Sequence, residues 1–290
     1  MKRMSIYLIG LALGVFLVWN RPVAKTFSLT VVHQALTQNT AWVNTTRPLT
    51  ADDLTGRILL LDFWTYCCIN CMHVIPELQA LEHRFGEQLT VIGVHSGKFY
   101  NERDGDHIKA AIHRYNIEHP VVNDANFSIW DQLGVHAWPT LILVNPLGKI
   151  EKVYTGEGHG KELERDIDAL VKKYAGQLKI APLPLAQEET KHAPSLLSFP
   201  GKLAFDPDRQ LLFISDSNHH RIVGTTLAGE VKMVVDSDFN RPQGILVHDG
   251  AVYVADTEHH LLRKIDLATK HVETIAGTGV PVNWSTLSTR

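Results

Sequence analysis

The first half of the chain alternates continuously apolar runs with segments in which apolar residues recur every three or four positions. The apolar runs at 58–64, 89–94 and 140–144 predict buried strands, with shorter strands at 120–122 and 149–154. The periodic segments at 74–85, 107–115, 127–133 and 163–174 predict amphipathic helices. Strands that alternate with helices predict an α/β sheet with helices on its faces.

The pattern changes in the second half. Residues Ala181–Ser195 are polar and rich in proline, which predicts a linker. Beyond it only strand patterns occur, and Leu211–Ile222 aligns with Ala251–Leu262 at a spacing of 40 residues. Four short strands in each period of about 40 residues are typical of the blades of a β-propeller. We therefore expect an all-β partial propeller of about two blades.

The repeat also places two histidine pairs, His219-His220 and His259-His260, at equivalent positions. Because the pairs recur at the repeat period, we interpret them as parts of blade turns and not as a metal site. A propeller closes with about 4–8 blades, and residues 280–290 carry no blade pattern. We expect a truncated propeller, with a ring completed by several chains as the alternative.

The N-terminus has Lys2 and Arg3 before an uncharged apolar run, Ser5–Trp19. This is the pattern of an export signal. The run is shorter than the ~20 residues that span a bilayer comfortably, and no good cleavage site follows it. We favour a retained membrane anchor over a cleaved signal or a buried helix. The pattern predicts a bacterial inner-membrane protein with its globular part in the periplasm or outside the cell.

Composition limits the remaining classes of protein to which the chain can belong. The chain has 290 residues, of which 44% are hydrophobic and 20% charged, and its net charge is −3. These values are those of a globular protein, and they give no basic surface for nucleic acid. The predicted domains are an anchor at 1–25, an α/β domain at 26–175, a linker at 176–198, two blades at 199–279 and a tail at 280–290.

All three cysteines, Cys67, Cys68 and Cys71, lie within five positions, between a predicted buried strand and a predicted helix. Three cysteines are too few for a disulfide framework, so redox chemistry is favoured. The start of a helix presents unpaired N–H groups and a partial positive charge, which stabilise a thiolate. We expect Cys68 to be the exposed nucleophile and Cys71, about one turn further, to resolve the mixed disulfide.

The stretch Asp62–Pro76 resembles the redox motif of thioredoxin-fold proteins, especially the TlpA-like thiol oxidoreductases. Phe63-Trp64, Cys68, Cys71 and Pro76 match that motif in register. The resemblance covers about residues 40–174 and implies a thioredoxin fold. It also implies that Asp62 assists proton transfer at the resolving thiol.

Trp138-Pro139 falls where the fold carries a cis-proline beside the cysteines. The resemblance implies that Trp64, Cys67, Trp138 and Pro139 form the substrate-facing surface. The string CCINC followed by blades resembles a narrower group, the thioredoxin-like proteins with NHL repeats. Cys67 stands where a tryptophan is usual, so its role is either packing or redox.

Several alternatives compete with thiol–disulfide exchange. Zinc could take Cys67, Cys68, Cys71 and His73, but ligands in one short helical segment do not easily surround an ion. Haem attachment fails because Met72 occupies the required histidine position. A thiol peroxidase is a minor alternative.

The rival from another class is a protein-binding propeller whose thioredoxin domain is only a scaffold. For the favoured oxidoreductase we expect no cofactor and no metal. The expected partners are protein or small-molecule disulfides and thiols, a protein bound by the blades, and the membrane.

Overall fold

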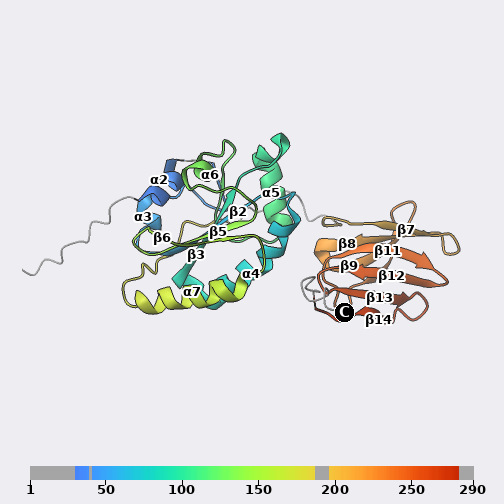
Figure 1. Ribbon diagram of the computed structural model, residues 1–290. Coiled ribbons are helices and arrows are strands. Elements are labelled where there is room, and N and C mark those ends of the chain that lie inside the picture. The colour runs from blue at the N-terminus through green and yellow to red at the C-terminus, as the bar shows by residue number, and fades with distance from the viewer. Residues whose placement is uncertain (1–29, 39–40, 187–195, 281–290) are drawn as a thin grey trace, which may run out of the picture. The chain divides into compact units, whose positions relative to one another are not determined.

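The computed structural model describes residues 30–38, 41–186 and 196–280, and the chain divides into two compact units, Met1–Glu188 and Glu189–Arg290 (Figure 1). The predicted anchor at 1–25 and residues 281–290 of the predicted tail lie outside the described residues. Within the described parts, no helix combines the length and the apolar character needed to cross a membrane.

The first unit is built on a six-stranded sheet with the order β1-β4-β3-β2-β5-β6. Its strands are β1 Trp42–Val43, β2 Ile58–Trp64, β3 Leu89–His95, β4 Val121–Asn123, β5 Thr140–Val144 and β6 Ile150–Thr155. The central strand β2 pairs in parallel with β3 and antiparallel with β5. All seven residues of β2 are buried, as its continuously apolar sequence predicts.

Helices cover both faces of this sheet (Figure 1). On one face, α4 Ile69–Phe85 and α7 Gly160–Lys173 pack on residues such as Leu60 of β2. On the other face, α2 Val31–Gln38, α3 Ala51–Leu54 and α6 Ser128–Gln132 pack on Leu61 and its neighbours. Helix α5 Gly105–Arg114 packs around the end of β2 where Trp64 lies. The predicted thioredoxin-like α/β fold is confirmed.

The short elements that were not predicted lie in parts of the chain with no regular hydrophobic pattern. Helix α2 is only eight residues long, too short for its apolar period to stand out, yet Val32 and Leu36 are completely buried. Tertiary packing, and not local propensity, holds such a short helix. Strand β1 has two residues, and its partner β4 lies far along the chain.

The first part of the segment predicted as a linker contacts the first unit. Lys179 N donates a hydrogen bond to Gly56 O (2.8 Å), and Thr46 N donates one to Pro184 O (2.9 Å). The polar, proline-rich composition does not reveal these backbone bonds, because they join residues far apart in sequence. The segment up to Ala186 therefore belongs structurally to the first unit.

The second unit contains two four-stranded antiparallel sheets, with the orders β10-β9-β8-β7 and β11-β12-β13-β14 (Figure 1). The strands are β7 Leu203–Asp206, β8 Leu211–Asp216, β9 Arg221–Thr226, β10 Val231–Val235, β11 Pro242–His248, β12 Ala251–Asp256, β13 Leu261–Asp266 and β14 Val272–Gly277. Ser215 Oγ donates to Gln243 O (2.8 Å), which joins the two sheets. This arrangement is that of a partial NHL-type propeller.

The repeated histidines have equivalent partners in the two sheets. His219 Nδ1 lies 2.8 Å from Asp216 Oδ2, and His259 Nδ1 lies 3.0 Å from Asp256 Oδ2. Both carboxylates are completely buried. Buried carboxylates need such partners, so these histidines bind within their own blades.

One buried carboxylate in the first unit holds together the loops at the carboxyl ends of β3 and β4. Asp124 accepts hydrogen bonds from Ser96 Oγ, Ile129 N and Trp130 N, each at 3.0 Å, and from Ser128 Oγ at 3.2 Å. It thus ties the residue after β3 to the first turn of α6. The carbonyl of Ser96 in turn accepts from Trp138 Nε1 (3.0 Å), so this cluster also positions the loop before β5.

We expect Asp124→Ala to lower the free energy of unfolding by about 3 kcal/mol, because it leaves buried backbone N–H groups without an acceptor. Urea denaturation followed by tryptophan fluorescence measures this loss. The exposed Asp131 of α6 provides the control, and Asp131→Ala should change the stability by less than about 0.5 kcal/mol. Equal losses in the two variants would contradict the assigned role of Asp124.

Candidate active site

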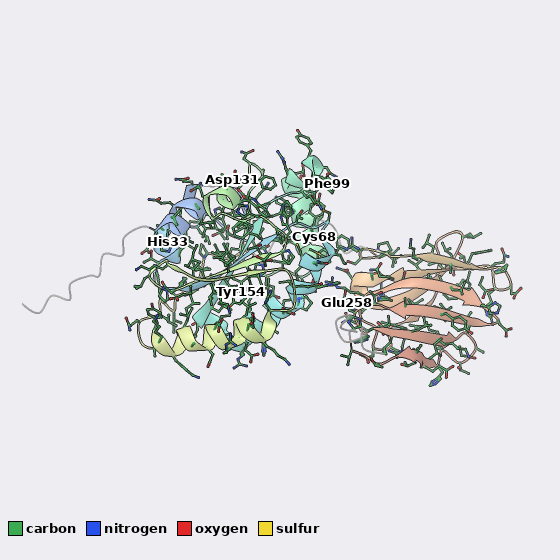
Figure 2. The ribbon with its side chains drawn as sticks, in the orientation of Figure 1. His33, Cys68, Phe99, Asp131, Tyr154 and Glu258 are labelled. Carbon is green, nitrogen blue, oxygen red and sulfur yellow. The ribbon has the colours of Figure 1, made fainter. Side chains whose placement is uncertain are left out.

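The cysteines lie where the central strand passes into helix α4. Figure 2 shows Cys68 at the same end of the first unit as Phe99, and His33 at the opposite end. Cys68 is the N-terminal cap of α4, and its Sγ accepts a hydrogen bond from Cys71 N (3.4 Å). The sulfur therefore caps the first turn of α4, where Cys71 N and Met72 N also donate to Cys68 O (3.1 and 3.2 Å).

The three thiols are all free and differ in exposure. Cys67 is exposed, Cys68 is half-buried and Cys71 is completely buried. Burial raises the pKa of the Cys71 thiol well above its usual range, and the hydrogen bond with Cys68 and the charge of Asp62 raise it further. Cys71 therefore holds its proton at neutral pH and needs a base before it can act as a nucleophile.

Cys67 has a different environment, set by Glu102 in the short helix Tyr100–Arg103. Cys67 N donates to Glu102 Oε1 (3.2 Å), and Phe99 N donates to Glu102 Oε2 (2.8 Å). Partial burial of the thiol raises the pKa of Cys67 to about 11, together with its hydrogen bond to Glu102 and the charge of that carboxylate. At neutral pH, Cys67 is therefore a protonated thiol.

Asp62 lies in the middle of β2 and faces α4. Its side chain is almost completely buried, and Oδ1 has no hydrogen-bond partner among the described residues. Burial raises the pKa of Asp62 to about 7; the charge of His119 lowers it and that of Glu82 raises it further. A carboxyl group that titrates near neutral pH can both accept and donate a proton under ordinary conditions.

Two of the four residues expected to face the substrate are buried. Trp64 is completely buried and packs edge-on against His95, with 4.9 Å between ring centroids. It therefore belongs to the core next to the site. Pro139 is also buried. The expected role of both residues in shaping the substrate-facing surface stays a prediction. Cys67 and Trp138 remain accessible at the surface.

The loop before β5 has the expected backbone conformation. The Trp138–Pro139 peptide bond is cis, as predicted. Trp138 and Cys68 pack against the same cluster of buried residues, which contains Trp64 and Cys71. The loop and the cysteines therefore belong to one region of the unit. Direct contact between the Pro139 ring and the sulfurs stays a prediction.

Four buried or half-buried side chains near this region were not found from the sequence. They are Glu82, His95, Glu102 and His119. His119 Nδ1 lies 3.2 Å from Glu82 Oε2, and burial lowers the pKa of His95 to about 4. These residues come from α4, β3, the short helix Tyr100–Arg103 and the bend before β4, and no sequence spacing links them. Among the described residues, no group of three or more His, Cys, Asp or Glu is arranged to hold a metal ion.

Comparisons with known proteins agree with this architecture. A family model described as thioredoxin-like matches residues 56–150, and an NHL repeat model matches residues 239–265. NHL repeat-containing protein 2 of Bos taurus is 42% identical over 82% of this chain, and the match covers 35% of that protein. Protein SUPPRESSOR OF QUENCHING 1, chloroplastic, of Arabidopsis thaliana is 45% identical over 82% of this chain and 25% of its own length.

A third relative is shorter. Thiol-disulfide oxidoreductase ResA of Halalkalibacterium halodurans is 30% identical over 42% of this chain and 67% of its own length. The chain thus spans about a third or less of the first two relatives and two thirds of the third. The fold is similar to that of thiol-disulfide oxidoreductases.

These relatives correct the predicted localisation. Two relatives that match over most of the chain are an animal protein and a chloroplastic plant protein, and the prediction of a bacterial inner-membrane protein is wrong. The prediction rested on a basic pair before an apolar run. That pattern reflects the general physics of membrane insertion and does not specify an organism or a membrane. The predicted membrane association has no support from the comparisons.

The fold and the two family matches lead to the same assignment. The α/β unit carries the thioredoxin-like match, and the β unit carries the NHL match. The α/β unit precedes the β unit along the chain, which is the order that the CCINC motif and the repeat predict. The chain therefore belongs to the thioredoxin-like proteins that also carry an NHL repeat.

Proposed function

We propose that the chain is a thiol–disulfide oxidoreductase in which Cys68 is the nucleophile and Cys71 the resolving thiol. The observation that carries this proposal is the position of Cys68 as the cap of α4, with its sulfur accepting the N–H of Cys71. The half-buried Cys68 is accessible to a substrate, and the buried Cys71 is held one turn behind it. The similarity to oxidoreductases such as ResA supports this chemistry.

The reaction proceeds in two exchanges. In the first, the Cys68 thiolate attacks one sulfur of a substrate disulfide, and the other substrate sulfur leaves as a thiolate that takes a proton from water. In the second, Asp62 removes the proton of Cys71, and the Cys71 sulfur attacks Cys68. The bond between Cys68 and the substrate breaks, the Cys68–Cys71 disulfide forms, and the substrate leaves reduced. The two electrons gained by the substrate come from the two cysteine thiols.

We also propose that the blades bind a protein partner, and the NHL match supports this proposal. Apolar side chains are exposed on the first strand of each sheet, namely Leu203 and Phe205 on β7 and Leu246 on β11. Exposed apolar groups of this kind favour contact with another protein surface. This function is compatible with an active thioredoxin-like unit, and a redox assay separates the enzyme from a pure scaffold.

Insulin reduction by the full chain, with dithiothreitol as the electron source, tests the roles of the cysteines. We expect Cys68→Ser to lower the rate at least 100-fold, to the background of the reductant. Cys71→Ser should stop turnover and trap the substrate as a mixed disulfide, visible by mass spectrometry. Cys67→Ser should keep the rate within threefold, because the Cys67 thiol is protonated at neutral pH.

A rate that falls equally in Cys67→Ser and Cys68→Ser would overturn the assignment of the nucleophile. A wild-type chain that does not reduce insulin above background would favour the scaffold. Free-thiol counting must show that each variant is reduced, and circular dichroism must show that it is correctly folded.

Asp62→Asn should raise the stability of the chain and lower its activity. The pKa of Asp62 is about 7 in the folded chain against an ordinary value of 3.8, so the folded state binds the proton more tightly than the unfolded state. Stability then falls as the pH rises from about 4 to about 7, and the full cost above pH 7 is of the order of 4 kcal/mol. Asp62→Asn removes this cost and also removes the base.

We therefore expect Asp62→Asn to raise the free energy of unfolding by up to about 4 kcal/mol at pH 8 and to change it little at pH 4. The second exchange should slow at least tenfold at pH 7. Urea denaturation at the two pH values and insulin reduction provide the measurements. A variant that gains equal stability at pH 4 and pH 8 would contradict the raised pKa of Asp62.

A further inference from the structure

The buried carboxyl group of Asp62 needs a route by which its proton reaches solvent. Asp62 is 2% exposed, and during turnover it must release the proton that it takes from Cys71. Helix α4 covers this face of the sheet, so water does not reach the carboxyl group directly. The following steps rest on the proposed function, in which Asp62 is the base for Cys71.

The neighbouring strand leaves a space beside Asp62. Asp62 pairs in register with Gly93 of the parallel strand β3, so the two residues face the same side of the sheet about 4.8 Å apart. A Cβ atom built on Gly93 would lie 3.0 Å from both Trp64 Nε1 and Val121 Cγ2, so these two side chains occupy the space beside the glycine. The same Cβ would lie 3.5 Å from His119 Nε2, so the imidazole of His119 lies within van der Waals range of the β3 position that pairs with Asp62.

His119 has one ring nitrogen engaged and the other unpaired. Its Nδ1 lies 3.2 Å from Glu82 Oε2, and its Nε2 is buried without a partner among the described residues. An ionised carboxylate only accepts hydrogen bonds, so this contact assigns the proton of the neutral imidazole to Nδ1. Nε2, which points toward Gly93, then carries the lone pair that can accept a proton.

Glu82 connects this buried pair to solvent. It lies on α4, and its side chain is 27% exposed, whereas that of His119 is 3% exposed. The titratable groups that face Asp62 are Cys71 and Glu82 from α4 and His119 from the bend before β4. His95 follows beyond Trp64 on the same face. Of these groups, Glu82 is the one that reaches the surface.

We propose that His119 and Glu82 form a proton path between Asp62 and solvent, and that they are positioning and relay residues for the exchange at Cys71. Asp62 takes the proton of Cys71 and passes it to His119 Nε2, directly or through one bridging water. His119 releases its Nδ1 proton to Glu82, and Glu82 gives it to bulk water. The path runs in reverse when the Cys68–Cys71 disulfide is reduced and Cys71 regains its proton.

The test uses an aromatic disulfide that releases a coloured thiolate at each exchange. Reduced full-length protein is mixed with excess reagent in a stopped-flow instrument. The first release reports the attack by Cys68, and the second reports the attack by Cys71 on the mixed disulfide. The leaving thiolate needs no proton, so the second phase depends on the removal of the proton from Cys71. The two phases test the proposed function and the proton path separately.

Glu82→Gln and His119→Gln should leave the first phase within twofold of the wild type. The plateau rate of the second phase should fall about tenfold or more in both variants, which is the lower range for a lost acid–base step. Loss of the Glu82 charge should also shift the pH profile of that phase to lower pH, because this charge raises the pKa of the Asp62 carboxyl.

Glu82 lies at the surface, so Glu82→Gln tests the path without altering the buried core. The matched control is Glu162→Gln, which removes the carboxylate from an exposed pair, His159 Nδ1 and Glu162 Oε2 at 3.3 Å, on α7. This control should change neither phase. Unchanged second-phase plateau rates in both path variants would overturn the proton path. A missing first phase in the wild type would instead overturn the proposed function.

Discussion

The loss of water around Asp62 is the constraint on which the rest of the site depends. A carboxyl group in the middle of a completely buried strand costs free energy in its ionised form, and within the described part of the chain Asp62 Oδ1 has no hydrogen-bond partner to offset this cost. The same burial brings its pKa to about 7, where it can exchange protons with a thiol. The destabilisation of the core and the capacity for chemistry therefore have one physical cause.

The environment also gives three neighbouring cysteines three different chemical characters. Cys68 receives the N–H of the first turn of α4, Cys71 is buried beneath it, and Cys67 lies beside the carboxylate of Glu102. A negative charge and partial burial disfavour a thiolate, whereas a helix N-terminus favours one. The adjacency of Cys67 and Cys68 in the sequence thus does not make them equivalent. The proposed roles of Cys68 as nucleophile and Cys71 as resolving thiol rest on these different contacts.

The sequence allowed the fold to be predicted where a signal is local or periodic. The apolar run of β2, the helical period of α4 and the 40-residue repeat are signals of this kind, and the structure contains each element. The cis bond before Pro139 was predicted through resemblance and not through any local pattern. The burial of Trp64 follows from the apolar run of β2, whereas that of Pro139 was not predicted, because it depends on the loops around the start of β5.

The residues that could not be predicted are those brought together by the pairing of distant strands. His119 follows α5 and Glu82 lies on α4, and they meet because β4 pairs in parallel with β3 beneath that helix. Gly93 is unremarkable in an apolar run, and its importance appears only through its register with Asp62. A Cβ atom at that position would lie 3.0 Å from Trp64 Nε1 and from Val121 Cγ2, and 3.5 Å from His119 Nε2. The register of two parallel strands thus places the buried acid beside the backbone position that the imidazole of His119 contacts.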